Sequence, residues 1–187
     1  MIRAIIETYL NPVEVDGQVR SLGYTWGVGG VLLLLLFAVY RLAPMAFALG
    51  DFQLTLLHWA VLLFNICYMA YAEGYKGFHL GFAPRVVSRA NYLLHNPRLS
   101  HIVLAPLFCM AYFHTTPKRQ RVSIALSILI VIFILIARQL PQPWRGILDA
   151  GVVVGLTMGI CSIAWFMLAS RFIPTYVSVP PDVPIED

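Results

Sequence analysis

Two long runs of apolar residues constrain the fold of this chain more than any other feature of its sequence. Residues 31–40 read VLLLLLFAVY, and residues 122–137 read VSIALSILIVIFILIA without a single charged side chain. Such runs are buried most simply in lipid, because a bilayer core requires about 20 mostly apolar residues per helix. The chain is 59% hydrophobic and 12% charged, whereas soluble domains carry about 25% charged residues. We therefore predict an all-α, polytopic integral membrane helix bundle with one membrane domain over residues 1–187.

Five hydrophobic segments can be separated along the chain. Prolines, charged residues and polar loops mark their ends, since these residues stop apolar helices at a membrane surface. A proline-rich segment over residues 172–187 follows the last of them and is predicted to be extended and outside the bilayer. The five predicted segments are residues 24–42, 52–72, 100–115, 122–137 and 149–170.

The third hydrophobic segment, residues 100–115, leaves two topologies open. It carries Pro106 near its middle and covers about 24 Å as a helix, which is nearly enough to cross. If the segment crosses, eight Lys and Arg residues lie on the side of the N-terminus and five lie opposite; if it is re-entrant, the counts become ten and three. Because cytoplasmic flanks collect basic residues, the charge pattern favours re-entry, while the segment length favours five spans. We predict five spans with a cytoplasmic N-terminus and keep the re-entrant arrangement as the alternative.

Residues 84–99, between the second and third segments, have the pattern of a basic amphipathic helix. Pro84 suits a first helical turn. Arg85 and Arg89 share one face, and apolar residues such as Val86 cover the other. Helices of this kind lie in the headgroup layer and bind anionic lipids. We predict an interfacial helix here, with docking of a partner protein as the alternative.

Three further charged residues are candidate contacts to lipid or to a partner. Lys76 lies in the glycine-rich stretch after the second segment, where we predict a local ion pair with Glu73. A headgroup contact or a proton-handling role of the Glu73 carboxylate is the alternative. Arg145 follows Trp144 and can reach a lipid phosphate, and Asp149 can cap the fifth helix. A pair formed by Arg145 and Asp149 at the mouth of a substrate site is the alternative for these two.

Glycines recur every fourth residue in the fifth segment, at Gly151, Gly155 and Gly159, and again in the first at Gly23 and Gly27. Small residues at this spacing share one helix face and let two membrane helices approach closely. We predict that the two glycine faces pack together within the chain. A homodimer and a contact with another subunit are the alternatives.

Polar side chains inside apolar segments are costly in a membrane, so they are functional candidates by default. His58 and Asn65 are seven residues apart in the second segment, which places them on one helix face, and Glu73 lies near its end. This row is a candidate for proton handling or substrate contact in a transporter.

Histidines supply the only cofactor hypothesis. Imidazoles on facing helices can hold a b-type haem, and the candidate ligands are His58, His101 and His114, with His58 and His114 as one conceivable axial pair. No HxxxH or HExxH spacing occurs, so no metal site is predicted. Interfacial histidines with satisfied hydrogen bonds and a proton relay are the other interpretations.

The three cysteines, Cys67, Cys109 and Cys161, fall inside apolar segments at wide spacing. An odd number of distant cysteines indicates neither a disulfide framework nor a CxxC metal or redox site. We predict that all three are buried free thiols.

The motifs leave the function open. No nucleophile elbow, phosphate loop or nucleotide fingerprint occurs, so an enzymatic activity stays uncertain. Basic residues do not cluster with aromatic ones as they do on nucleic-acid-binding faces, so no nucleic-acid partner is predicted. Small size and a glycine-rich packing face favour an accessory or structural subunit of a membrane complex, whose partners are lipid and other membrane subunits or itself. A small transporter or lipid-handling dimer and a histidine-ligated redox protein are the alternatives.

Overall fold

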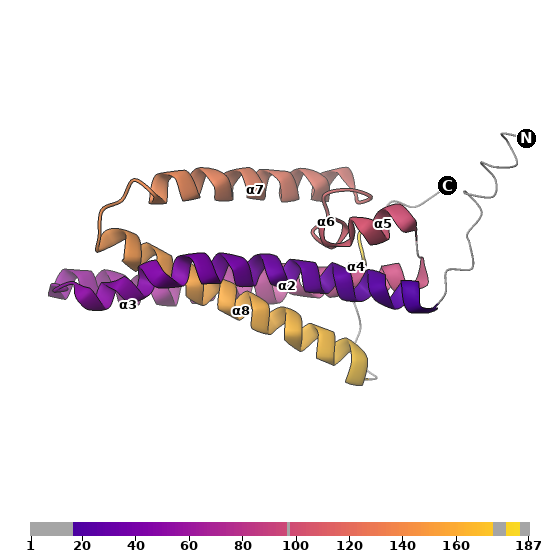
Figure 1. Ribbon diagram of the computed structural model, residues 1–187, viewed down its shortest axis with the longest axis horizontal. Coiled ribbons are helices and arrows are strands. Elements are labelled where there is room, and N and C mark those ends of the chain that lie inside the picture. Colours follow the sequence, from indigo (N-terminus) through magenta and orange to yellow (C-terminus); the bar gives the residue numbers. More distant parts are fainter. Residues whose placement is uncertain (1–16, 97, 174–178, 184–187) are drawn as a thin grey trace, which may run out of the picture.

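The computed structural model describes residues 17–96, 98–173 and 179–183, and these residues form helices and loops without β-strands. The long helices lie along one direction, with α7 set apart from the others (Figure 1). The first half contains α2 (Gly17–Phe47), η1 (Ala48–Asp51), α3 (Leu56–Met69), η2 (Ala70–Phe82) and α4 (Ala83–His95). The second half contains α5 (Leu99–Val103), α6 (Ala105–Cys109), α7 (Pro117–Ala137) and α8 (Trp144–Phe172).

Four helical stretches in the described ranges are long and apolar enough to cross a membrane. Most of their apolar side chains point outward instead of into a protein core, including Leu33, Phe64 and Ile130. A helix that is apolar on its outer face is stable in lipid but not in water. The all-helical, membrane-compatible architecture predicted from the sequence is therefore confirmed. The four stretches are Ser21–Asp51, Leu56–His95, Pro117–Ala137 and Trp144–Phe172.

The third predicted segment, residues 100–115, does not form one helix. It consists of α5 and α6, each of five residues, which are too short to cross a bilayer. Pro106 lies in the first turn of α6, where a proline starts a new helix and cannot continue the previous one. After α6 the chain turns through Ala111 and His114, whose φ angles are 61° and 48°. Among the described residues four helical stretches are long and apolar enough to cross, and a fifth crossing at this segment is not confirmed.

The basic segment 84–99 also differs from the prediction. It does not form a helix of its own, because α4 continues α3 and η2 in a single helical run over Leu56–His95, and its predicted position at the membrane interface is not confirmed. The apolar side of α4 belongs to the core, where Val86 and Leu93 are fully buried. The basic side is covered as well, since Arg89 is only 1% exposed. Protein therefore covers both faces of a segment whose pattern suggests one face in lipid and one in water.

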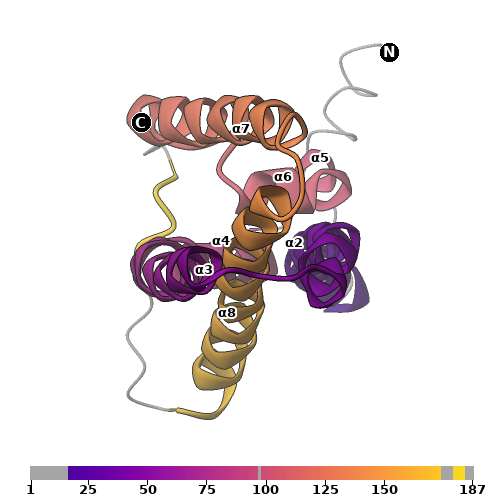
Figure 2. The same ribbon diagram turned by 90° about the vertical axis from the view of Figure 1, so that its left-hand side faces the viewer.

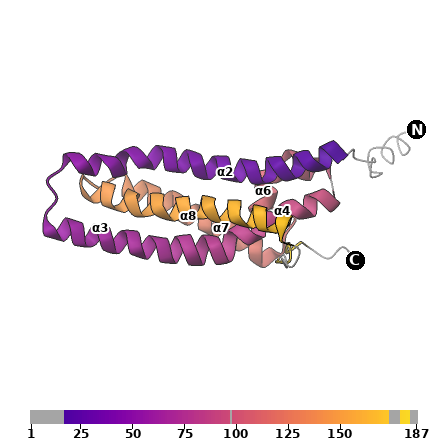
Figure 3. The same cartoon turned by 90° about the horizontal axis from the view of Figure 1, so that it is seen from below.

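The glycine face of α8 packs against α3 and η2, and α8 lies between these helices and α2 (Figure 3). An ideal Cβ at Gly151 would lie 2.2 Å from Asn65 Nδ2, and one at Gly159 would lie 2.6 Å from Phe78 Cδ1. Only glycine permits this approach. We call this contact the glycine seam; along α8 it contains Gly151, Gly155 and Gly159.

The glycines of α2 have a different partner from the predicted one. A Cβ at Gly27 would lie 2.8 Å from Cys109 Sγ, and one at Gly30 would lie 2.3 Å from Pro106 Cγ. Gly23 faces Ile102 in the same way. The two glycine faces thus pack within the chain, but α2 uses its face to hold α5 and α6 and not the glycines of α8.

Helix α7 lies apart from the layer formed by α2, α3 and α8 (Figure 2). Ala137 is its only buried residue in the isolated chain. Polar contacts tie its first half to the loop after α6: Ser123 Oγ donates to the Met110 carbonyl at 2.9 Å, and Gln120 Nε2 donates to the Tyr112 carbonyl at 2.8 Å. The space between α7 and α4 is where the candidate site lies.

Candidate functional site

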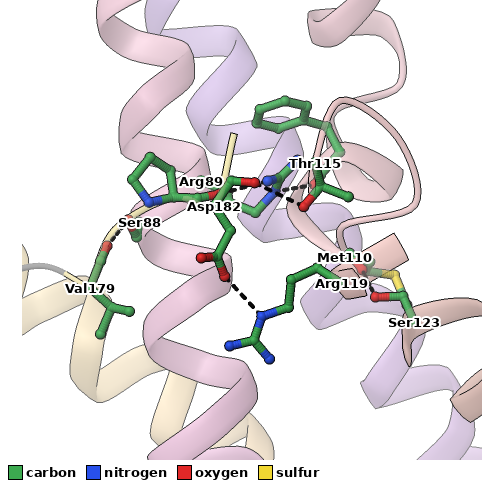
Figure 4. A network of polar contacts seen from close by, with 10 residues as sticks. Ser88, Arg89, Met110, Thr115, Arg119, Ser123, Val179 and Asp182 are labelled. Atoms are coloured by element: carbon green, nitrogen blue, oxygen red, sulfur yellow. Dashed lines mark hydrogen bonds and ion pairs between the residues drawn. The ribbon is translucent and has the colours of Figure 1, made fainter. Parts of the chain in front are cut away.

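A polar network gathers where α4, the loop after α6, the start of α7 and residues 179–183 meet (Figure 4). Arg89 of α4 is at its centre. Its Nε donates to the Phe108 carbonyl at 2.6 Å, and its Nη1 donates to the Pro181 carbonyl at 2.7 Å. Its Nη2 donates to the carbonyls of Phe113 and His114, both at 3.1 Å. Four backbone carbonyls, and no carboxylate, therefore satisfy this buried guanidinium.

The described part of the C-terminal tail, residues 179–183, lies across α4 instead of extending away from the protein. Ser88 Oγ donates to the Val179 carbonyl, and Thr115 Oγ1 donates to the Asp182 carbonyl at 3.0 Å. The Asp182 carboxylate pairs with Arg119 Nε of α7 at 3.0 Å (Figure 4). These contacts link α4, the loop before α7 and α7 itself. The remaining residues of the predicted tail, apart from Phe172 and Ile173, lie outside the described ranges.

A cavity of about 280 Å³ opens beside this network, between η2–α4 and the first half of α7. We call it the basic groove, because four cationic side chains line it and Asp182 is the one carboxylate among its described lining residues. Phe82, Val122 and Leu126 contribute apolar walls. The cationic side chains are Lys76, Arg85, Arg89 and Arg119.

Arg85 is the guanidinium in the groove that makes no hydrogen bond or ion pair with any described residue. It is half-buried and lies one turn before Arg89, with its Nη2 close to Gly81, where a Cβ would be 3.2 Å away. Within the described residues it makes no hydrogen bond or ion pair. The one carboxylate nearby, Asp182, is held by Arg119. Removing a charge from water without pairing it is unfavourable, so this guanidinium is suited to an anion from outside the chain.

Lys76 enters the groove from η2. Its Nζ lies 4.9 Å from the ring centroid of Tyr71, and the predicted ion pair with Glu73 is not formed. The reason is local geometry, because η2 is a π-helix. Hydrogen bonds from i to i+5 widen the turn, so residues three apart no longer face one another as they do in an α-helix. Lys76 is left available to the groove, and Glu73 faces Gly155 across the glycine seam.

The predicted polar row of the second segment is divided by the structure. Asn65 Nδ2 donates to the Ile147 carbonyl of α8 at 2.8 Å, so Asn65 lies in the glycine seam with Glu73. His58 instead caps the start of α3: its Nδ1 lies 3.2 Å from Thr55 N, and its ring stacks edge-on against Trp144. Asn65 and Glu73 therefore belong to the glycine seam and His58 to a helix cap, so the three residues do not form a continuous polar path.

The candidate histidine ligands fall into two places. His101 and His114 have ring centroids 4.6 Å apart and pack beside Phe108 near α6. His58 lies in the first turn of α3, at the other end of the run that ends in α4. The suggested axial pair of His58 and His114 is thus not brought together. The described residues contain no group of three or more His, Cys, Asp or Glu that could hold a metal ion.

Arg145 and Asp149 lie far from the groove, at the start of α8. They form an ion pair, with Arg145 Nε 3.7 Å from Asp149 Oδ2. Because α8 begins at Trp144, Asp149 lies inside the helix and does not cap it. Of the predicted lipid contacts, Lys76, Arg85 and Arg89 line one groove, while these two residues belong to the opposite end of the molecule (Figure 1).

The cysteines differ from one another. Cys109 is buried beside the groove, and burial raises the pKa of its thiol to about 12. Cys67 and Cys161 are exposed in the isolated chain, because they lie on outward faces of the long helices and not in the core. The prediction of three buried thiols holds for Cys109 alone.

Two groove residues were not singled out from the sequence. Arg119 belongs to the basic cluster KRQR at residues 118–121, which reads as the flank of a membrane helix. Asp182 lies in a proline-rich tail, a composition that carries no signal for a contact with α7. A groove rich in donors and cations can bind an acceptor-rich anion.

Comparisons with protein-family models, with curated proteins and with solved structures find no match for this chain.

Proposed function

We propose that this chain is a multi-pass membrane protein that handles lipid and holds an anionic headgroup in the basic groove. The observation that supports this most directly is Arg85, a half-buried guanidinium beside Lys76 and Arg119 that makes no hydrogen bond or ion pair with the described residues. Basic pockets between membrane helices are typical sites for anionic headgroups. The apolar groove walls are compatible with the first carbons of a lipid chain.

The proposed membrane placement has four crossings, with both described ends of the chain on the cytoplasmic side. The two ends of the bundle differ in charge, and cytoplasmic ends collect Lys and Arg. The groove end of the bundle contains α4, α5, the start of α7 and the end of α8 (Figure 1). These elements and the residues next to them carry Arg85, Arg98, Lys118, Arg119, Arg121 and Arg171. The end of α2, the end of α7 and the start of α8 lie at the opposite end and carry Arg41, Arg138 and Arg145. In this proposed orientation the groove lies at the leaflet where anionic lipids are enriched.

Native mass spectrometry of the purified full chain in detergent tests lipid binding. Anionic phospholipid, a mixture of phosphatidate and phosphatidylglycerol, is titrated against phosphatidylcholine with matched acyl chains. We expect the wild-type chain to retain the anionic lipid preferentially and Arg85→Gln to lose about tenfold in affinity, the effect of roughly one charge-assisted hydrogen bond.

Arg121→Gln is the matched control. Arg121 lies two residues after Arg119, is exposed, and donates only to the Pro117 carbonyl of its own helix. Arg121→Gln removes the same charge near the groove, at the start of α7, from a residue that is not among its lining residues. Equal retention of anionic lipid by wild type, Arg85→Gln and Arg121→Gln would contradict the proposed function.

A second candidate is the accessory subunit of a membrane complex, and α7 is the observation in its favour. Its outer residues, among them Ile128 and Val131, are exposed on a helix that packs little within its own chain. Replacing both residues by Ala would remove packing contacts with a partner helix while keeping the surface of α7 apolar. This role predicts a one-to-one co-purifying membrane protein that is lost when Ile128 and Val131 are replaced by Ala. A monodisperse wild-type chain that retains only lipid would exclude it.

A further inference from the structure

We propose that the headgroup bound in the basic groove is a phosphomonoester, as in phosphatidate, and not a phosphodiester. This inference rests on the proposed lipid-binding function and specifies the chemistry of the ligand. It follows from three properties of the groove: its free hydrogen-bonding groups, its charge and its apolar walls.

The free hydrogen-bonding groups in the groove are mainly donors. Arg85 makes no bond within the described residues, Lys76 contacts only the Tyr71 ring, and Arg119 uses Nε for Asp182. The one carboxylate among the described lining residues is engaged in that ion pair. A headgroup that carries an ammonium or hydroxyl group would bring donors to a site already full of them, whereas a terminal phosphate brings only acceptors in its ionised form.

The charge of the groove favours a dianion over a monoanion. Backbone carbonyls occupy the Nε and both Nη atoms of Arg89, but these neutral partners leave its positive charge in the groove. Four cationic side chains and the Asp182 carboxylate give the described lining a net charge of +3, four less one. A phosphomonoester carries a charge of about −1.5 to −2 at neutral pH, whereas a diester carries about −1. The monoester therefore neutralises the groove more fully.

The apolar residues that line the groove indicate that the bound phosphate is attached to an apolar chain. Val122 and Leu126 are four residues apart on α7, so they form one apolar strip that leads from Arg119 toward the exposed apolar part of the helix. Phe82 and Met110 line the groove as well. Its volume of about 280 Å³ suits a headgroup and the adjoining carbons but not a complete lipid. The ligand is therefore a membrane lipid with its chain along α7, not a soluble phosphate.

The test compares two lipids that share acyl chains and differ in the phosphate ester. Full-length protein in phosphatidylcholine nanodiscs is titrated with phosphatidate or with phosphatidylglycerol, and bound lipid is counted by native mass spectrometry. We expect phosphatidate to bind about tenfold more tightly, and Arg85→Gln to abolish this preference while Arg121→Gln retains it. Thermal unfolding of each variant verifies that the fold is intact, since Arg85 makes no contact whose loss would unfold the chain.

The outcomes separate the two proposals. Equal affinities for phosphatidate and phosphatidylglycerol, both above phosphatidylcholine, would overturn the monoester inference and leave the lipid-binding function standing. Binding of neither anionic lipid above phosphatidylcholine would remove the function itself. A third experiment adds glycerol 3-phosphate as a soluble competitor. If it displaces phosphatidate at equal concentration, the groove binds a soluble phosphate ester and the claim that its ligand is a membrane lipid is overturned. Failure of glycerol 3-phosphate to compete supports it.

Discussion

Arg85 and Arg89 are one helical turn apart on α4, and their surroundings give them different roles. The donors of Arg89 are spent on carbonyls of the loop after α6 and of the tail, and its guanidinium lies 4.1 Å from the Phe108 ring centroid. It holds these segments in place and is a structural residue. Arg85 makes no such bonds and faces the groove, so it is available to a ligand.

Substitution of Arg89 by Met separates these roles. The change leaves the carbonyls of Phe108, Pro181, Phe113 and His114 without their donor in a buried site. We expect the free energy of unfolding to fall by about 3 kcal/mol, as for other buried charges whose loss orphans their partners. Arg85→Met should change it by about 0.5 kcal/mol or less, as for a side chain without bonds to lose. Thermal unfolding in detergent measures both, and equal losses in the two variants would be inconsistent with this division.

At the level of secondary-structure elements, the sequence indicates which helix faces pack closely but not their partners. The glycine spacing of α8 and of α2 correctly identifies two close-packed faces. Their partners depend on where α5 and α6 lie, and Pro106 decides this by ending one short helix and starting another. The π-helical form of η2 has no signature in an apolar periodicity of 3.6 residues, so the orientation of Lys76 and Glu73 could not be derived from spacing.

The glycine seam is tested by adding one methyl group. In Gly151→Ala the new Cβ would lie 2.2 Å from Asn65 Nδ2, which also donates to the Ile147 carbonyl. We expect a loss of about 1–3 kcal/mol in the free energy of unfolding, the usual cost of overpacking. Gly29→Ala is the matched control, because nothing lies within 4 Å of its Cβ, and better helix propensity should make it neutral or about 1 kcal/mol more stable. The seam assignment fails if the two variants unfold alike.

At the scale of the whole molecule, the four-crossing topology has a consequence that five crossings do not share. In the proposed four-crossing placement, both described ends of the chain would lie on one side of the membrane, and the loop between α7 and α8 would lie on the other. Reporter domains fused to the N-terminus, to the C-terminus and within residues 138–143 distinguish the two topologies. We expect the two terminal reporters to be cytoplasmic and the loop reporter to be on the far side. Terminal reporters on opposite sides would support five crossings.

The groove itself could be predicted only in part from the sequence. Lys76, Arg85 and Arg89 stand out, because basic residues beside apolar segments are expected at headgroups. Arg119 and Asp182 do not, since their pairing joins a helix start to a tail residue 63 positions later. Residues that make a groove basic are visible locally, whereas the folding of the tail over α4 depends on long-range hydrogen bonds that no local pattern encodes.

The central claim is that the groove holds a phosphate-bearing lipid through Arg85, and the lipid that remains bound after extraction tests it most directly. Wild type, Arg85→Gln and Arg121→Gln are extracted from the native membrane in mild detergent, and the retained lipids are identified by mass spectrometry. We predict that wild type and Arg121→Gln each retain about one phosphomonoester lipid per chain, and that Arg85→Gln retains little or none. The same lipid content in all three proteins would contradict the claim.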